Sequence, residues 1–320
     1  MSNIASYFGV NPKKLQRHYK HKSSGYHQWD QGNHADKYLI YPENLTPTIS
    51  IDEVCLSKGE LYTIISNKRV GVQNRKSLIA IISSTESKEI IEVLNKIPLE
   101  QRSIVKEVTL DMARNMSLAT KTCFPNAIQT IDRFHVVKLA IEVIQHIRVK
   151  YRWAAIKEEN ELIKQSKAKG VKYKPKIYAN GETKKELLAR SRFLFYKFKE
   201  KWTPIQAKRA ELLFEMYPEL KNAYSIVVGF RYIYHSQNKD VARMQFEELK
   251  KKVARSGIEE FNSCINSLNY HMENILNYFE NKNTNANAES FNSKIKGFRA
   301  EVRGVQDVKF FLFRLEKLFA

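Results

Sequence analysis

Five short apolar runs between residues 49 and 131 constrain the fold of this 320-residue chain more than any other feature. The runs cover residues 49–56, 61–66, 78–83, 105–110 and 127–131. Helical periodicity over residues 87–97 and 112–124 separates the last three of them. Three successive strands, followed by two strands reached through helices, form a mixed sheet with helices on its faces. We therefore predict an α/β domain built on one such sheet.

The charge of the chain indicates what it binds. There are 54 Lys and Arg residues against 34 Asp and Glu residues, which gives a formal net charge of +20. A hydrophobic fraction of 43% is ample for a folded core, so the chain is not a disordered basic tail. Such an excess of positive charge attracts polyanions. Nucleic acid is the expected partner, and an anionic membrane is the weaker alternative because no basic helix has a clean apolar face.

The region after the apolar runs is expected to be helical. Residues 136–161 show one long helical pattern, residues 164–176 form a lysine-rich link, and helical patterns resume at residues 187–198, 204–217 and 241–253. From Lys138 to Arg209 there are 20 Lys and Arg residues against 7 Asp and Glu residues. We interpret this stretch as a platform that contacts DNA; a solvated face is the alternative.

These patterns predict the domain organisation. The order of strands and helices is that of ribonuclease H, so we expect a ribonuclease H-like mixed sheet flanked by helices and interrupted by a large all-helical insertion. The first part of the core would span residues 49–137, the basic insertion residues 138–280, and the last part of the core residues 281–320.

Residues 1–48 are expected to form a basic N-terminal appendage. Ile4 and Phe8 would share one face of a short helix, Gly9 would lie in a turn, and Pro12 would begin a second, lysine-rich helix. This order of helix, turn and helix is typical of part of a helix-turn-helix motif, which would contact DNA. A basic amphipathic helix without a role in reading sequence is the alternative. The four histidines of the segment lack metal-ligand spacing, so we expect them to be solvated.

The cysteines and apolar segments exclude several classes of protein. Cys55, Cys123 and Cys264 lie far apart, and no C-x-x-C pair occurs. This spacing excludes a zinc ribbon or zinc finger within the chain and argues against a disulfide framework. The first residues lack the apolar core of a signal peptide, and no run approaches about 18 apolar residues. We expect a cytoplasmic protein with reduced cysteines and no membrane partner.

Two aspartates in the strand-like runs are candidate metal ligands. Asp52 interrupts the run at residues 49–56, and Asp111 directly follows the run at residues 105–110. A carboxylate at such a position is costly unless it is paired, hydrogen-bonded or metal-bound. Adjacent strands would bring both anions together, and a cation between them would relieve their repulsion. A surface or capping role is the alternative for each. Glu53 should point to the opposite face of its strand and is a poor candidate.

A third acid begins a basic helix near the end of the chain. After the polar loop at residues 281–287, an apolar stripe marks a helix with Phe291, Ile295, Phe298 and Val302 at helical spacing. On the other side, Glu289, Lys296 and Arg303 repeat every seven residues. Asp52, Asp111 and Glu289 would bind two Mg²⁺ ions, with Mn²⁺ as a substitute. The candidate phosphate contacts beside them are Lys294, Lys296, Arg299 and Arg303.

Four sequence motifs, in the same order along the chain, resemble those of a known family. The blocks SIDEV, EVTLDMARNM, CFPNAIQTIDRFHVVKLA and NTNANAESFNSKIKGFRAEVRG are similar to those of the DDE transposases of bacterial insertion sequences, in the ISL-three group. The resemblance covers residues 49–320. It implies a ribonuclease H-like core with an insertion, Asp52, Asp111 and Glu289 as the catalytic, metal-binding triad, and DNA strand cleavage and transfer at the ends of the element.

The resemblance also bears on accessory residues and partners. Asp132 and His135 are similar to an Asp-x-x-His signature, and they would either shape the site or form an ordinary helix start with a core histidine. Joining two transposon ends implies a homodimer on double-stranded DNA in the bacterial nucleoid. Relatives usually carry a longer N-terminal region with a zinc motif and a full helix-turn-helix. Three alternatives follow: end recognition is weakened, a separate short protein supplies it, or the chain is truncated.

Two other interpretations of the same sequence remain open. One is a catalytically inactive or repurposed DNA-binding protein derived from a transposase, which would keep the motifs without the activity. The other is a ribonuclease H or a resolvase, which shares the core but does not account for the basic helical insertion. The terminal repeats, the target site and the choice between cut-and-paste and copying are not encoded in any pattern that we find.

Overall fold

The computed structural model describes residues 2–56, 60–68, 77–282, 286–301 and 307–320. These residues form two compact units. The first contains residues 1–132 and 283–320, and the second contains residues 133–282. The unit boundary at residue 133 lies close to the predicted start of the insertion, and the first unit includes the N-terminal segment that we expected to be an appendage.

The first unit is built on a six-stranded mixed sheet with the strand order β1-β4-β3-β2-β5-β6. Its strands are β1 (Tyr38–Ile40), β2 (Thr48–Cys55), β3 (Leu61–Asn67), β4 (Leu78–Ile82), β5 (Glu107–Leu110) and β6 (Ile128–Ile131). Strand β2 pairs antiparallel with β3 and parallel with β5, and β5 pairs parallel with β6. This is the predicted ribonuclease H-like arrangement, with β1 added at one edge.

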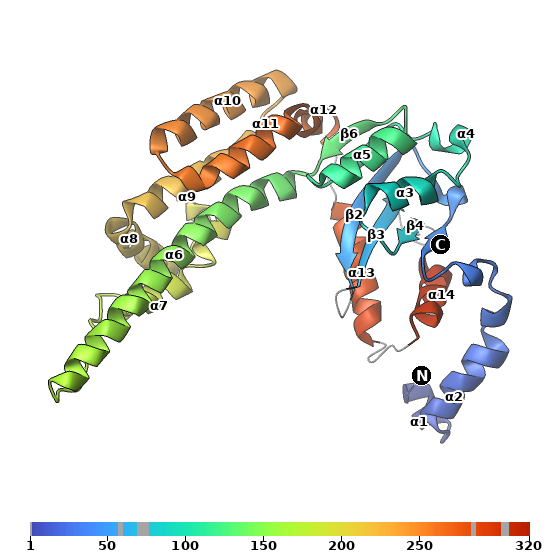
Figure 1. Cartoon of the computed structure of the whole chain (residues 1–320), viewed down its shortest axis with the longest axis horizontal. Coiled ribbons are helices and arrows are strands. Elements are labelled where there is room, and N and C mark those ends of the chain that lie inside the picture. Colours follow the sequence, from blue (N-terminus) through green and yellow to red (C-terminus); the bar gives the residue numbers. More distant parts are fainter. Residues whose placement is uncertain (1, 57–59, 69–76, 283–285, 302–306) are drawn as a thin grey trace. The chain divides into compact units, whose positions relative to one another are not determined.

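Helices cover both faces of this sheet (Figure 1). They are α3 (Ser87–Leu94), α4 (Leu99–Arg102), α5 (Arg114–Cys123), α13 (Ala286–Glu301) and α14 (Val308–Phe319). Helix α5 packs on β5 and β6 and also contacts α3. On the other face, Phe291 and Ile295 of α13 and Phe311 of α14 join a buried cluster with Val54 of β2 and Ile64 of β3. The apolar stripe predicted for residues 291–298 therefore faces the sheet.

The N-terminal segment is part of the sheet unit, which corrects the prediction of an appendage. Strand β1 extends the sheet beside β4. The Trp29 indole donates a hydrogen bond to Glu316 Oε2 at 2.6 Å, and the Tyr41 hydroxyl donates to the same oxygen at 2.8 Å. The rings of Tyr26 and Trp29 also pack against Phe313 of α14. Aromatic contacts between chain segments far apart in sequence thus join this segment to the core.

The first residues do form the predicted pair of short helices. Helix α1 (Ser2–Tyr7) and helix α2 (Pro12–His18) flank Gly9, whose φ of 62° suits a residue without a side chain. The Asn11 side chain caps α2 by accepting hydrogen bonds from the backbone N–H groups of Lys13 and Lys14. Their role in binding DNA stays a prediction.

The second unit, residues 133–282, consists of helices and the segments that connect them, without a strand among its described residues. Its helices are α6 (Arg133–Ala168), α7 (Lys184–Arg190), α8 (Pro204–Met216), α9 (Pro218–Ile233), α10 (Lys239–Ser256), α11 (Asn262–Leu276) and α12 (Tyr278–Asn281). The long helix α6 packs against α7, α9 and α11. The pattern at residues 187–198 is not one helix, because α7 ends at Arg190. Ser191 donates its hydroxyl hydrogen bond to the Leu187 carbonyl, a local bond that competes with continued helix. No helix among the described residues is long and apolar enough to cross a membrane.

Candidate active site

Asp52 and Asp111 lie on the same face of neighbouring parallel strands. Ser50 of β2 pairs with Thr109 of β5, and each aspartate lies two residues beyond one member of this pair. Side chains two apart share a face, and neighbouring strands are about 4.8 Å apart. Both aspartates are half-buried. The two carboxylates that the sequence predicts as metal ligands are therefore placed side by side at one end of the sheet.

Each aspartate is also held by its own backbone. Asp52 Oδ1 accepts a hydrogen bond from the Glu53 N–H at 2.9 Å, and Asp111 Oδ1 accepts one from the Ala113 N–H at 2.8 Å. Such bonds restrict the direction in which each carboxylate points. The side chain of Glu53 takes the opposite face, where it meets Asn115 of α5 at 3.5 Å, so the prediction that it points away is confirmed.

Asn292 connects helix α13 to this pair, and sequence reasoning missed it. Its Nδ2 donates a hydrogen bond to Asp52 Oδ2 at 2.6 Å. Its side chain is buried, and its Oδ1 accepts no hydrogen bond within the described part of the chain. Glu289 lies three residues earlier on α13 and is exposed. Residues three apart share a helix face, so this spacing was the signal that could have identified Asn292.

The third strand repeats the same polar pattern. Thr130 of β6 pairs with Thr109, and Asp132 follows two residues later, as Asp111 follows Thr109. Asp132 is only 2% exposed. Ser50, Thr109 and Thr130 are likewise buried, so this sheet face, which is apolar at Val54 and Ile64, becomes polar where β2, β5 and β6 pair. A hydroxyl residue two positions before each aspartate is a sequence signal for this polar face.

A lysine is buried on this polar face. Lys68, directly after β3, donates a hydrogen bond from its Nζ to Thr109 Oγ1. Glu107 accepts a hydrogen bond from the Thr130 hydroxyl at 2.9 Å. Burial lowers the pKa of Lys68 to about 8, while the negative charges of Glu107 and Asp132 act in the opposite direction. The lysine thus supplies a positive charge among the buried acids behind the candidate site.

This burial predicts a pH dependence of stability. Lys68 keeps its charge in the unfolded chain up to a pKa near 10.5 but loses it in the folded protein near pH 8. The folded state therefore bears the cost of the buried charge below pH 8, and that cost disappears between pH 8 and 10.5. The free energy of unfolding of the wild type, minus that of Lys68→Met, should rise by about 3 kcal/mol across this window. Denaturant titrations at several pH values measure it; a flat or falling difference would contradict the assignment.

The basic residues of α13 do not all have the predicted exposure. Lys294 and Lys296 are exposed, and their contacts to phosphate stay a prediction. Arg299 is 8% exposed, forms an ion pair with Glu60 at 3.0 Å and stacks over the Phe311 ring at 4.8 Å. The geometry of Arg299 is that of a packing residue, which corrects the expectation of an exposed phosphate contact. Arg303 and Val302 lie outside the described residues.

His135 belongs to the first turn of α6, in the helical unit, whereas Asp132 ends the sheet unit. The His135 ring is half-buried and meets the Phe134 ring edge-on at 5.5 Å. Its accessory role stays a prediction.

The donor atoms of this region fit a hard divalent cation. Asp52 and Asp111 offer carboxylate oxygens, and the buried Asn292 Oδ1 adds an oxygen that no described group satisfies. Mg²⁺ prefers such oxygens and few protein carboxylates. Within the described residues, however, no group of three or more His, Cys, Asp or Glu side chains is close enough to hold a metal ion. Glu289 would have to turn toward the aspartates to complete a triad.

Comparison with known proteins decides the family. The chain matches the family model of the ISL-three-type DDE transposases, described as transposase, over residues 49–315. The chain belongs to this transposase family. The match spans the sheet unit from β2 onward, the whole helical unit and most of α14. No curated protein and no solved structure matches the chain. As a transposase, the protein acts on DNA, in agreement with its net charge of +20.

Proposed function

We propose that this transposase cleaves DNA strands at the ends of an insertion sequence and joins them to target DNA in a reaction that depends on divalent metal ions. The observation that carries the proposal is the hydrogen bond from Asn292 to Asp52, because it brings the helix of Glu289 to the strand that lies beside Asp111. Asp52, Asp111 and Glu289 would together hold two Mg²⁺ ions, or Mn²⁺ in their place.

Bound ions would lower the pKa of a coordinated water and stabilise the leaving oxygen. The residues of the chain orient the two carboxylates and supply positive charge that would bind DNA phosphates. Asp52 and Asp111 are held by backbone N–H groups, so both keep a fixed direction as the substrate arrives. Lys294 and Lys296 are exposed on the helix of Glu289 and would bind phosphates on either side of the cleaved bond. Joining two DNA ends favours a homodimer.

The competing proposal is a DNA-binding protein that has lost catalysis. It is consistent with a family match and a basic surface, but it does not explain why Asn292 holds Asp52 beside Asp111. Nicking of supercoiled DNA with Mg²⁺ or Mn²⁺, and its absence in EDTA, distinguishes the two. Metal-independent binding without any nicking would favour the inactive protein.

The basic composition predicts a steep dependence of DNA binding on salt. Each phosphate contact releases condensed counterions, so about four contacts would weaken binding about tenfold for each doubling of salt. Fluorescence anisotropy with a labelled duplex between low and physiological salt measures the slope. A nearly flat response would mean that the interface is not dominated by phosphate contacts.

A further inference from the structure

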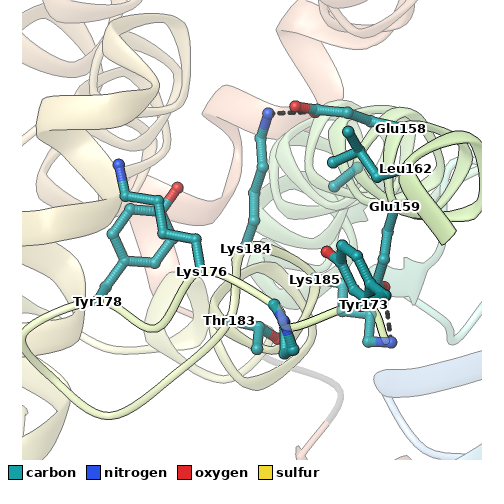
Figure 2. A pocket seen from close by; sticks show the side chains of 11 residues that line it. Glu158, Glu159, Leu162, Tyr173, Lys176, Tyr178, Thr183, Lys184 and Lys185 are labelled. Atoms are coloured by element: carbon teal, nitrogen blue, oxygen red, sulfur yellow. Dashed lines mark hydrogen bonds and ion pairs between the residues drawn. The ribbon is translucent and has the colours of Figure 1, made fainter. Parts of the chain in front are cut away.

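A pocket of about 300 Å³ lies in the helical unit, away from any residue used above. Figure 2 shows it between the C-terminal half of α6, which contributes Glu158 and Leu162, and the chain segment that follows that helix. Its volume is at the lower end of the range of about 300–1,000 Å³ found for ligand clefts. It is large enough for one flat ring system rather than for a duplex.

Two tyrosines line this pocket from different sides. In Figure 2 the Tyr178 ring lies on one side together with Lys176, and the Tyr173 ring lies on the other together with Lys185. Both tyrosines are half-buried, and neither ring packs against another aromatic ring within the described residues. An aromatic face open to a pocket is a stacking surface that is tolerant of base identity.

The segment that carries the tyrosines is strongly basic. After α6 the chain turns at Gly170, whose φ is 68°, and runs back along the helix. Residues 162–181 contain lysines at positions 164, 167, 169, 172, 174 and 176 and no acidic residue. Lys172, Lys174 and Lys176 are exposed around Tyr173. Lysines on both sides of an aromatic ring suit a single strand, in which each base lies between two phosphates.

The acids of the pocket wall are already neutralised. Glu158 pairs with Lys184 at 2.6 Å, and Glu159 pairs with Lys185 at 2.6 Å (Figure 2). Lys176 is the lysine of the pocket wall that pairs with neither of these two acids, and its Nζ lies 5.3 Å from the centre of the Tyr178 ring. A positive charge over this ring, in the wall of the pocket, lies close enough to bind the phosphate next to a base that enters the pocket. The pocket therefore combines a flat apolar surface with one cation placed for phosphate.

We propose that this pocket binds one unpaired nucleobase of a DNA strand, stacked on Tyr178 or Tyr173, while Lys172, Lys174 and Lys176 hold the phosphates around it. The proposal rests on the proposed function, because cleavage and joining of strands at transposon ends expose unpaired bases. It assigns the helical insertion a preference for DNA with unpaired ends over blunt duplex. A free nucleotide would not use the lysines that extend along the segment beyond the pocket.

The test compares two DNA molecules in EDTA, where no cleavage occurs. Fluorescence anisotropy gives the affinity of the full chain for a blunt duplex and for the same duplex with a 3′ overhang of about six bases. We expect the wild type to bind the overhang DNA about tenfold more tightly, since each stacked base contributes on that scale. Tyr178→Leu should remove most of this preference and leave blunt-duplex affinity within about twofold, whereas Tyr178→Phe should retain it because stacking needs the ring and not the hydroxyl.

Two further variants separate this site from general charge. Tyr270→Ala, at an exposed ring on α11, should leave the preference intact. Lys176→Ala should weaken binding to the overhang DNA more than binding to the blunt duplex, and it should lower the salt slope for the overhang DNA by about one. Absence of a preference in the wild type, or an equal loss on both DNA molecules in Tyr178→Leu, overturns the proposal. Metal-dependent nicking by the wild type is measured in parallel, so that failure of the pocket and failure of the catalytic proposal give different results.

Discussion

Asp111→Asn should reduce metal-dependent nicking of DNA by at least about a thousandfold, the scale expected when a group that acts on the transition state is removed. Asp111 lies beside Asp52, and its Oδ2 accepts no hydrogen bond within the described residues, which leaves that oxygen for a metal ion. An amide of the same shape keeps the bond to the Ala113 N–H but supplies no charge. DNA binding should be unchanged or slightly stronger, because removing a negative charge does not weaken attraction to a polyanion.

The measurement pairs a nicking assay on supercoiled DNA with anisotropy on a labelled duplex in the same buffer. Asp240→Asn is the matched control: it makes the same chemical change at an exposed position in the first turn of α10. It should nick at the wild-type rate. Equal loss of nicking and binding in Asp111→Asn would show a folding defect, and normal nicking would remove Asp111 from the proposed triad.

The sheet could be predicted because its strands are local apolar runs. The five runs between residues 49 and 131 correspond to β2 to β6, and the helices between the last three lie where periodicity indicated. Strand β1 was missed because it is only three residues long and pairs with β4, some 40 residues later in the chain. The contact of Trp29 with Glu316 could not be predicted either, since no local pattern encodes a pairing between opposite ends of the chain.

The candidate site was predictable to the extent that strand alternation determines it. The adjacent positions of Asp52 and Asp111 follow from the parallel pairing of β2 and β5. Glu53 points to the opposite face because successive residues of a strand alternate between the two faces. Lys68 had no sequence signal, because its direction across the sheet depends on tertiary packing rather than on the strand before it. We expected Arg299 on the exposed face of α13, but its ion pair with Glu60 and its contact with the Phe311 ring bury its side chain. Periodicity places residues on a face and does not reveal such contacts.

Asn292→Ala should lower nicking by about 10- to 100-fold at limiting Mg²⁺, the range found when the partner of a metal-binding carboxylate is removed. The Asn292 side chain holds Asp52 Oδ2 at 2.6 Å from a helix that also carries Glu289. Without this bond the carboxylate can rotate away from Asp111, and α13 loses a polar contact with β2. Saturating Mg²⁺ should restore part of the rate, because the ion itself then orients the two aspartates.

A titration of nicking rate against Mg²⁺ concentration therefore distinguishes a positioning role from a purely structural one, since a loss of fold would lower the rate equally at every Mg²⁺ concentration. Ser293→Ala changes the exposed neighbouring residue on α13 and should leave the titration unchanged. Asn292→Asp should lose more activity than Asn292→Ala at low Mg²⁺, because it places a second carboxylate against Asp52. Identical Mg²⁺ midpoints in the wild type and Asn292→Ala would mean that Asn292 only packs α13 onto the sheet, and that Glu289 reaches the aspartates without it.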